Sequence, residues 1–157
     1  MGTRSVVAIP TADGWRGRYI HWDGYPEGVG ESLRLIVQRD GLDLAVKTLT
    51  ENHFGWSSVN DDAQDAHDEP IRFEFVPGYG TAYSAKEQED TWVTSDGDNW
   101  GTEYAYVLTP DGIVVLGART SDGFHSTGMF GVNAGASWGE LGRVAYTGSM
   151  DDLPVEN

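Results

Sequence analysis

Residues 16–49 read RGRYIHWDGYPEGVGESLRLIVQRDGLDLAVKTL, and this stretch sets out a strand, a connecting turn and two helices. Arg16 to Trp22 mixes aromatic and polar side chains, as a half-exposed strand does. Pro26 suits the first turn of a helix, where its missing N–H has no hydrogen bond to lose. The change from strand pattern to helix pattern within a few residues makes this stretch decisive for the fold.

The helical part of this stretch predicts two consecutive helices. The first is expected from about Glu27 to Arg39, with Gly41 ending it, and the second follows with Asp40 as its cap and Asp43 in its first turn. Asn52 and His53 close the second helix. Each helix shows one apolar face, formed by Val29, Leu33, Ile36 and Val37 and then by Leu42, Ala45, Val46 and Leu49.

Strand patterns lie on both sides of the helices. Ser5 to Ile9 is apolar and β-branched, and the turn signal at 12–14 lets it form a hairpin with the strand at 16–22. Beyond the helices, residues 54–70 read as a loop and residues 78–90 are weakly patterned. The remaining strands are expected around Ile71, Phe73 and Phe75, at Thr91–Thr94, at Thr102–Leu108, at Ile113–Leu116 and at Arg143–Thr147.

These elements predict the α+β class, with an antiparallel β-sheet and a helical hairpin packed on one face. The chain has 157 residues, which corresponds to one domain. We expect that α+β domain to cover residues 1–150, followed by a mobile tail at 151–157.

The charge of the chain is strongly negative and unevenly distributed. Ten Lys and Arg stand against 25 Asp and Glu, for a net charge of −15. Residues 51–103 hold 13 of the acids and only two of the bases. This balance argues against nucleic acids and anionic membranes as partners. It leaves cations, basic protein surfaces or no partner at all, and the simplest interpretation is solubility through repulsion between like charges.

Several function classes are excluded or disfavoured by composition. The chain contains no Cys, so disulfides, thiolate catalysis and Cys-bound zinc are excluded. No apolar run approaches the length of a membrane span, and residues 1–10 lack the apolar core of a signal peptide. We therefore expect a cytoplasmic protein. Its oligomeric state is left open by the sequence.

The segment His21–Gly30, HWDGYPEGVG, is the most unusual stretch and is called the elbow below. One interpretation is structural, with Trp22 and Tyr25 packed, Asp23 accepting N–H bonds from the start of the helix, and Arg4 pairing with Asp23. The other is a binding site formed by Arg4, His21, Trp22, Asp23 and Tyr25, because aromatic walls and a few polar groups are typical of ligand pockets. His21 is the one acid–base candidate there.

The N-terminal part of the chain resembles a known group of proteins. Thr3-Arg4-Ser5, a short hairpin, the HWDGYPxGVG motif and a Leu-bearing helix are similar to a family of small proteins from bacteriophages, especially those of actinobacteria, and from related bacterial genomes. The resemblance covers about residues 3–37, and Glu103–Tyr106 is weakly similar as well. It implies a bacteriophage-type origin and a shared elbow, and it implies no reaction.

Three further motifs have simpler explanations. Gly135–Gly139 fits G-x-S-x-G around Ser137, but no clear strand, helix or later His provides the context of a catalytic serine. Asp96–Asn99 is typical of a turn, since the full calcium-loop spacing is absent. His67 stands among acids at 61–69 without a second closely spaced His. We therefore expect no catalytic residue, no metal site and no cofactor.

The sequence favours a non-enzymatic, acidic binding protein of bacteriophage type, acting in the cytoplasm of the host. The main alternative is a small-ligand or nucleotide-binding protein, or an enzyme, that uses the elbow as its site. A lesser alternative is a nucleic-acid mimic, in which fixed carboxylates of the acidic middle occupy a basic host protein.

Overall fold

The computed structural model describes residues 3–12, 14–62, 73–83, 91–94, 102–110, 112–120, 123–124 and 142–148. Several segments that the sequence analysis singled out lie outside this set. They are the motif around Ser137, the turn at Asp96–Asn99, Ile71, most of the acidic stretch 61–69 and the tail 151–157.

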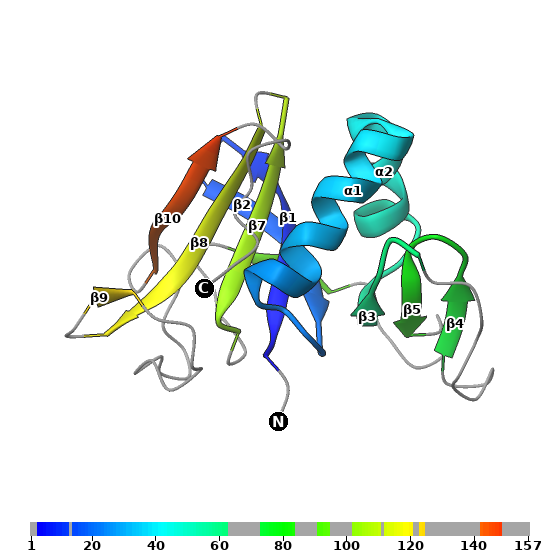
Figure 1. Ribbon diagram of the computed structural model, residues 1–157, viewed down its shortest axis with the longest axis horizontal. Helices are drawn as coiled ribbons and strands as arrows, with labels where there is room; N and C mark the ends of the chain where they lie inside the picture. Colours follow the sequence, from blue (N-terminus) through cyan, green and yellow to red (C-terminus); the bar gives the residue numbers. More distant parts are fainter. Residues whose placement is uncertain are drawn as a thin grey trace.

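The helical segments follow one another between β2 and β3, and the other elements are strands, as Figure 1 shows. The strands are β1 (Ser5–Thr11), β2 (Gly14–Ile20), β3 (Gly55–Val59), β4 (Phe73–Val76), β5 (Gly80–Tyr83), β6 (Val93–Thr94), β7 (Tyr104–Thr109), β8 (Gly112–Thr120), β9 (Gly123–Phe124) and β10 (Gly142–Gly148). The helical segments are η1 (Pro26–Gly30), α1 (Glu31–Asp40), α2 (Leu42–Val46) and η2 (Lys47–Glu51), where η1 and η2 are π-helical turns.

The strands form a sheet in the order β10-β8-β7-β1-β2-β3-β5-β4, with β6 on β2 and β9 on β8. The α+β class and the helical hairpin are confirmed, but the sheet is mixed rather than purely antiparallel. β1 pairs with β7 in parallel, and β2 pairs with β3 in parallel. Both exceptions join strands separated by long connections, so no turn signal in the sequence marks them.

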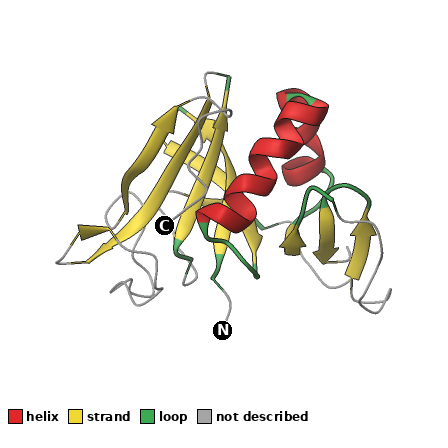
Figure 2. Ribbon diagram, viewed as in Figure 1, coloured by secondary structure: helices red, strands yellow, loops and turns green. Residues whose placement is uncertain are grey.

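The helical pair forms at the predicted place. Its first turn is the π-helical η1, which begins at Pro26 and runs directly into α1. Gly41 ends α1 with a φ of 88°, and its N–H donates to the carbonyl oxygen of Val37. The second helix closes at Glu51, with Asn52 as its C-cap, as expected. In Figure 2 the two helices lie next to each other, between the larger group of strands at the left and β3, β5 and β4 at the right.

The main hydrophobic core lies between the helices and the sheet. Leu33, Ile36 and Leu49 are fully buried, whereas Val46 is only partly buried against the same cluster. From the sheet, this core takes in Ile20, Trp56 and Tyr106 among others. The opposite side of the sheet has a smaller core, formed by Val6, Ala8, Trp15, Val93, Ala105 and Val107. The sheet is therefore covered by apolar packing on both faces around β1.

Asp40 does not cap the second helix, contrary to expectation. Gly41 occupies the N-cap position, and no side chain there accepts a cap hydrogen bond. The Asp40 carboxylate instead accepts hydrogen bonds from Arg39, at 2.8 Å, and from the Tyr79 hydroxyl, at 2.6 Å. These two bonds hold the pKa of Asp40 down at about 2. The end of α1 is thereby tied to the β4–β5 hairpin.

The predicted loop at 54–70 contains a strand instead, β3. Its residues Gly55, Trp56 and Ser57 are all buried, so burial does not alternate along the strand. Its sequence, GWSSV, likewise shows no alternation of polar and apolar side chains. The indole N–H of Trp56 donates to the carbonyl oxygen of Leu49 at 3.0 Å. A strand buried on both faces with two serines in it lacks the pattern by which a half-exposed strand is recognised.

A buried arginine connects β2 to two other segments. Arg18 is 2% exposed, and its Nε donates to the carbonyl oxygen of Thr50 at 2.8 Å. Its Nη1 donates to the carbonyl oxygen of Thr91 at 2.9 Å, and the guanidinium carbon lies 3.5 Å from the centroid of the Trp92 ring. Carbonyl oxygens and an aromatic face are suitable partners for a desolvated guanidinium. Arg18 therefore joins β2 to the end of η2 and to the segment before β6.

Candidate functional site

The elbow lies where β2 ends and the helices begin, beside the starts of β1 and β7 (Figure 1). Asp23 adopts a φ of 57°, the left-handed conformation that Asp and Asn tolerate better than most residues. The carbonyl oxygen of Asp23 accepts the N–H of Val29 at 2.9 Å. The backbone of Asp23, rather than its carboxylate, therefore supplies the contact to the first helical turn.

The inner side of the elbow is closed by Gly24. Its N–H donates to the carbonyl oxygen of Thr3 at 2.7 Å, and its carbonyl oxygen accepts the hydroxyl of Tyr106 at 2.6 Å. A Cβ at position 24 would lie 2.6 Å from the Cβ of Ser5 and 2.7 Å from the Thr3 oxygen. Glycine is therefore required here by the close approach of the Ser5 side chain and the Thr3 carbonyl oxygen.

The outer side of the elbow carries the exposed groups. Trp22 is 44% exposed, and Asp23 is exposed as well. The ring of His21 meets Trp22 edge-on, with centroids 4.7 Å apart. Tyr25 packs against the main core instead of joining them. Among the five predicted residues, His21, Trp22 and Asp23 thus lie together outside, while Tyr25 contributes to packing.

The ring of His21 contacts Tyr19 of β2, and the positive charge of Arg4 acts on it. Its Nδ1 lies 2.9 Å from the hydroxyl oxygen of Tyr19. Partial burial, and then the positive charge of Arg4, lower the pKa of His21, so the ring is neutral at pH 7. No ion pair between Arg4 and Asp23 is formed, although both residues are described. The expected Arg4–Asp23 link is therefore wrong.

A buried acid, Glu103, lies beside Arg4 and is not among the predicted site residues. Glu103 is 6% exposed, and its N–H donates to the carbonyl oxygen of Arg4 at 2.8 Å. Burial raises the pKa of Glu103, while the Arg4 backbone N–H, the Arg4 charge and the Thr3 hydroxyl act to lower it. In the sequence, Glu103 is marked only by its position directly before the strand at Tyr104–Tyr106. That position does not predict that its side chain is buried.

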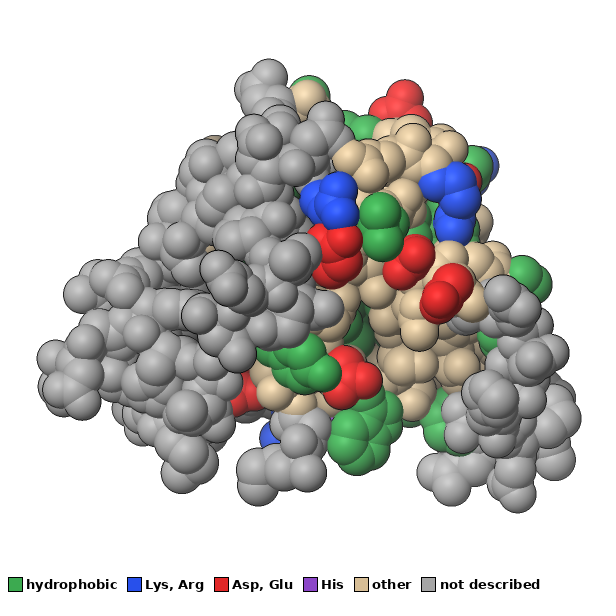
Figure 3. Space-filling view, viewed as in Figure 1, with side chains coloured by type: hydrophobic (Ala, Val, Ile, Leu, Met, Phe, Trp, Pro, Cys, Tyr) green, Lys and Arg blue, Asp and Glu red, His purple; other side chains and the backbone are tan. Residues whose placement is uncertain are grey.

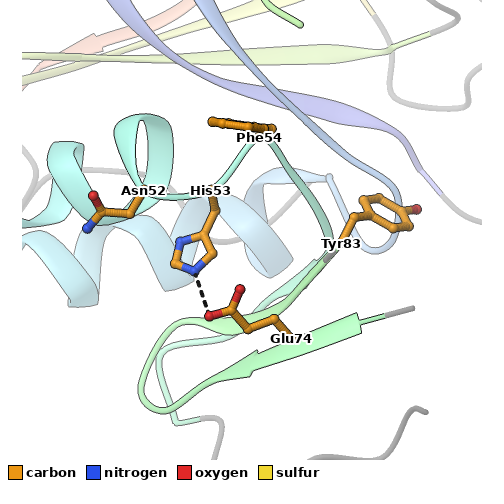
Figure 4. A pocket seen from close by; sticks show the side chains of 5 residues that line it. All are labelled: Asn52, His53, Phe54, Glu74 and Tyr83. Atoms are coloured by element: carbon orange, nitrogen blue, oxygen red, sulfur yellow. Dashed lines mark ion pairs between the residues drawn. The ribbon is translucent and has the colours of Figure 1, made fainter. Parts of the chain in front are cut away.

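A second cluster of polar side chains lies at the other end of the helical pair, and Figure 4 shows it from close by. Its cavity has a volume of about 40 Å³ and is lined by Asn52, His53, Phe54, Glu74 and Tyr83. Nε2 of His53 lies 3.6 Å from a carboxylate oxygen of Glu74. This volume holds water molecules rather than a substrate of several rings.

Comparison with protein-family models, with curated protein sequences and with solved structures finds no match for this chain. In the part of the chain that the structure describes, no helix is long and apolar enough to cross a membrane.

Proposed function

We propose that this protein is a non-enzymatic, acidic binding protein of bacteriophage type that acts in the host cytoplasm on a host protein with a basic surface. The observation that carries the proposal is the form of the elbow. Its inner side is closed by main-chain hydrogen bonds and by the Tyr106 hydroxyl, while Trp22 remains 44% exposed on the outer side. Exposed tryptophan is a frequent anchor in protein interfaces.

The charge of the chain supports the same proposal. A net charge of −15 attracts a basic surface over a distance and accelerates the encounter with it. The same charge repels phosphate backbones and anionic lipids. Among the described residues on the face that Figure 3 shows, acidic and basic side chains both occur, which fits steering by net charge better than one continuous acidic patch on that part of the face.

The use of the elbow as a small-ligand or catalytic site has less support. Its central polar groups, the N–H and carbonyl oxygen of Gly24, are already bonded within the protein. Trp22 and Asp23 lie on the surface, whereas ligand pockets bury most of their ligand. A nucleic-acid mimic needs carboxylates held at fixed spacing, and most acids of the 61–69 stretch lie outside the described residues.

The proposal is tested by site-specific photo-crosslinking in an actinobacterial lysate. Benzoylphenylalanine replaces Trp22 in one variant and Leu44, which is 52% exposed on α2, in the control. We expect the first variant alone to crosslink one host protein with a basic surface, and excess wild-type protein to compete for it. Equal crosslinking from both positions, or none from position 22, contradicts the proposed surface.

The captured protein is then purified, and its affinity is measured with point variants. Trp22→Ala is expected to weaken binding at least about tenfold, as loss of an interface anchor does, while Leu44→Ala leaves the affinity unchanged. A panel of nucleotides tested by thermal shift addresses the alternative. A nucleotide that stabilises the wild type and not His21→Ala would overturn the binding-protein proposal in favour of a ligand site.

A further inference from the structure

His53 presents one ring nitrogen in a fixed orientation. Its Nδ1 lies 3.0 Å from the carbonyl oxygen of Thr48, and a carbonyl oxygen only accepts, so Nδ1 carries the proton. The ring also lies against Trp56, with centroids 5.1 Å apart, and the side chain is 10% exposed. In the neutral ring the lone pair is therefore on Nε2. A backbone carbonyl on the other nitrogen is one of the common ways in which proteins orient a metal-binding histidine, beside a carboxylate or a water molecule.

Glu74 of β4 faces this nitrogen. Its carboxylate oxygen is 3.6 Å from Nε2, beyond the length of a good hydrogen bond, and its side chain is 58% exposed (Figure 4). Zinc binds imidazole nitrogen and carboxylate oxygen at about 2.0–2.2 Å each. Two such ligands at a tetrahedral ion stand roughly 3.3–3.6 Å apart by the same bond lengths. The separation of the two groups thus fits a shared ion.

We propose that His53 and Glu74 form a site for a divalent cation that prefers nitrogen ligands, such as Zn²⁺. Imidazole favours zinc and its transition-metal neighbours over Ca²⁺ and Mg²⁺. The described residues contain no cluster of three or more His, Cys, Asp or Glu side chains. Water therefore supplies the other ligands, for which the adjoining cavity of about 40 Å³ has room.

The bound ion joins two parts of the fold. His53 follows the helical pair, and Glu74 lies on β4 at the edge of the sheet. The high negative charge of the chain raises the local concentration of cations at such a site. This inference concerns a place in the fold away from the elbow, and it stands or falls independently of the proposed binding function.

The test is calorimetric titration of tag-free protein with ZnCl₂, in excess MgCl₂ to saturate non-specific acidic sites. We expect one zinc per chain, with the affinity reduced at least about tenfold in both His53→Gln and Glu74→Gln. His21→Gln is the matched control, because His21 is also partly buried with its Nδ1 already in contact, here with the Tyr19 hydroxyl, and it should bind zinc like the wild type.

Two outcomes would overturn the site. Unchanged zinc affinity in His53→Gln places the ion elsewhere. Loss of affinity in His53→Gln without any loss in Glu74→Gln leaves a single imidazole and no shared site. Because Glu74 is mostly exposed, Glu74→Gln is expected to fold normally, and zinc-dependent shifts of the His53 ring protons in NMR spectra provide a readout that does not depend on stability.

Discussion

The hydroxyl of Tyr106 donates a 2.6 Å hydrogen bond to the carbonyl oxygen of Gly24, a residue 82 positions earlier in the chain. Both residues are buried. The bond connects the middle of β7 to the elbow, and it satisfies a carbonyl group that Gly24 places away from water. It is thus the contact that makes the elbow a part of the core.

Removing this hydroxyl should destabilise the fold. Tyr106→Phe leaves the Gly24 carbonyl without that donor, and we expect the free energy of unfolding to fall by about 1–3 kcal/mol. Urea denaturation measures the change. Tyr83→Phe is the control, because the Tyr83 hydroxyl makes no hydrogen bond in the described part of the chain, and its effect should stay within about 0.5 kcal/mol. Equal effects would contradict the assigned role of the bond.

Asp23 should be sensitive to side-chain shape rather than to charge. Its carboxylate makes no hydrogen bond within the described residues, and its φ is 57°. We expect Asp23→Asn to change the free energy of unfolding by less than about 0.5 kcal/mol. Asp23→Val, in contrast, should cost about 1–2 kcal/mol, because a β-branched residue fits the left-handed region poorly. A large loss in Asp23→Asn would show instead that the carboxylate has a partner.

Glu103 should make stability fall as the pH rises. Burial raises its pKa in the folded protein above the ordinary 4.5, so ionisation favours the unfolded chain. Below about pH 4 both states hold the proton and no penalty exists, whereas above the folded pKa the full penalty applies. Glu103→Gln is therefore expected to gain stability relative to the wild type between about pH 4.5 and pH 7. Urea denaturation at both pH values measures the free energy of unfolding of the variant and of the wild type. A difference between the two proteins that is the same at both pH values would refute this prediction.

Leu33 should contribute strongly to the main core. It is fully buried between α1 and the sheet, and we expect Leu33→Ala to lower the free energy of unfolding by about 2–5 kcal/mol. Leu44→Ala is the matched control, since Leu44 is 52% exposed and should change stability by less than about 0.5 kcal/mol. Chemical denaturation of both variants under one condition separates them. Similar losses would mean that Leu44 is covered in solution.

Salt should stabilise the protein modestly. With a net charge of −15, repulsion among the acids opposes the compact state at low ionic strength. Added salt screens this repulsion beyond about 8–10 Å, so the melting temperature should rise with NaCl concentration in a differential scanning fluorimetry series. KCl serves as a control for ion identity. A steady fall of the melting temperature would indicate that the acids are mainly engaged in attractive pairs.

The elements with a regular period were predictable from the sequence, and those shaped by distant neighbours were not. The helical pair shows its apolar face at residues such as Leu33 and Leu49, both of which are buried. β3 was missed because Trp56 and Ser57 are buried side by side. Asp40 is expected to cap the nearest helix start, but its carboxylate instead accepts hydrogen bonds from Arg39 and from Tyr79 of the β4–β5 hairpin.

The candidate site, too, could be predicted from the sequence only in part. The unusual composition of the elbow marked His21 and Trp22, which the structure places in contact. Local sequence gives no reason for Glu103 to lie beside Arg4, because the two meet only through the parallel pairing of β1 with β7. His53 and Glu74 likewise come from different elements and carry no common motif.

The parallel pairing of β1 with β7 has a consequence for synthesis on the ribosome. Ser5–Ala8 cannot meet Tyr104–Val107 until roughly a hundred further residues have been made. At about 5–20 residues per second, this takes about 5–20 seconds. During that interval the β1–β2 hairpin exposes one strand edge with Val6 and Val7 on it. The nascent chain therefore presents an open, apolar strand edge for several seconds, at which pairing with another chain competes with folding.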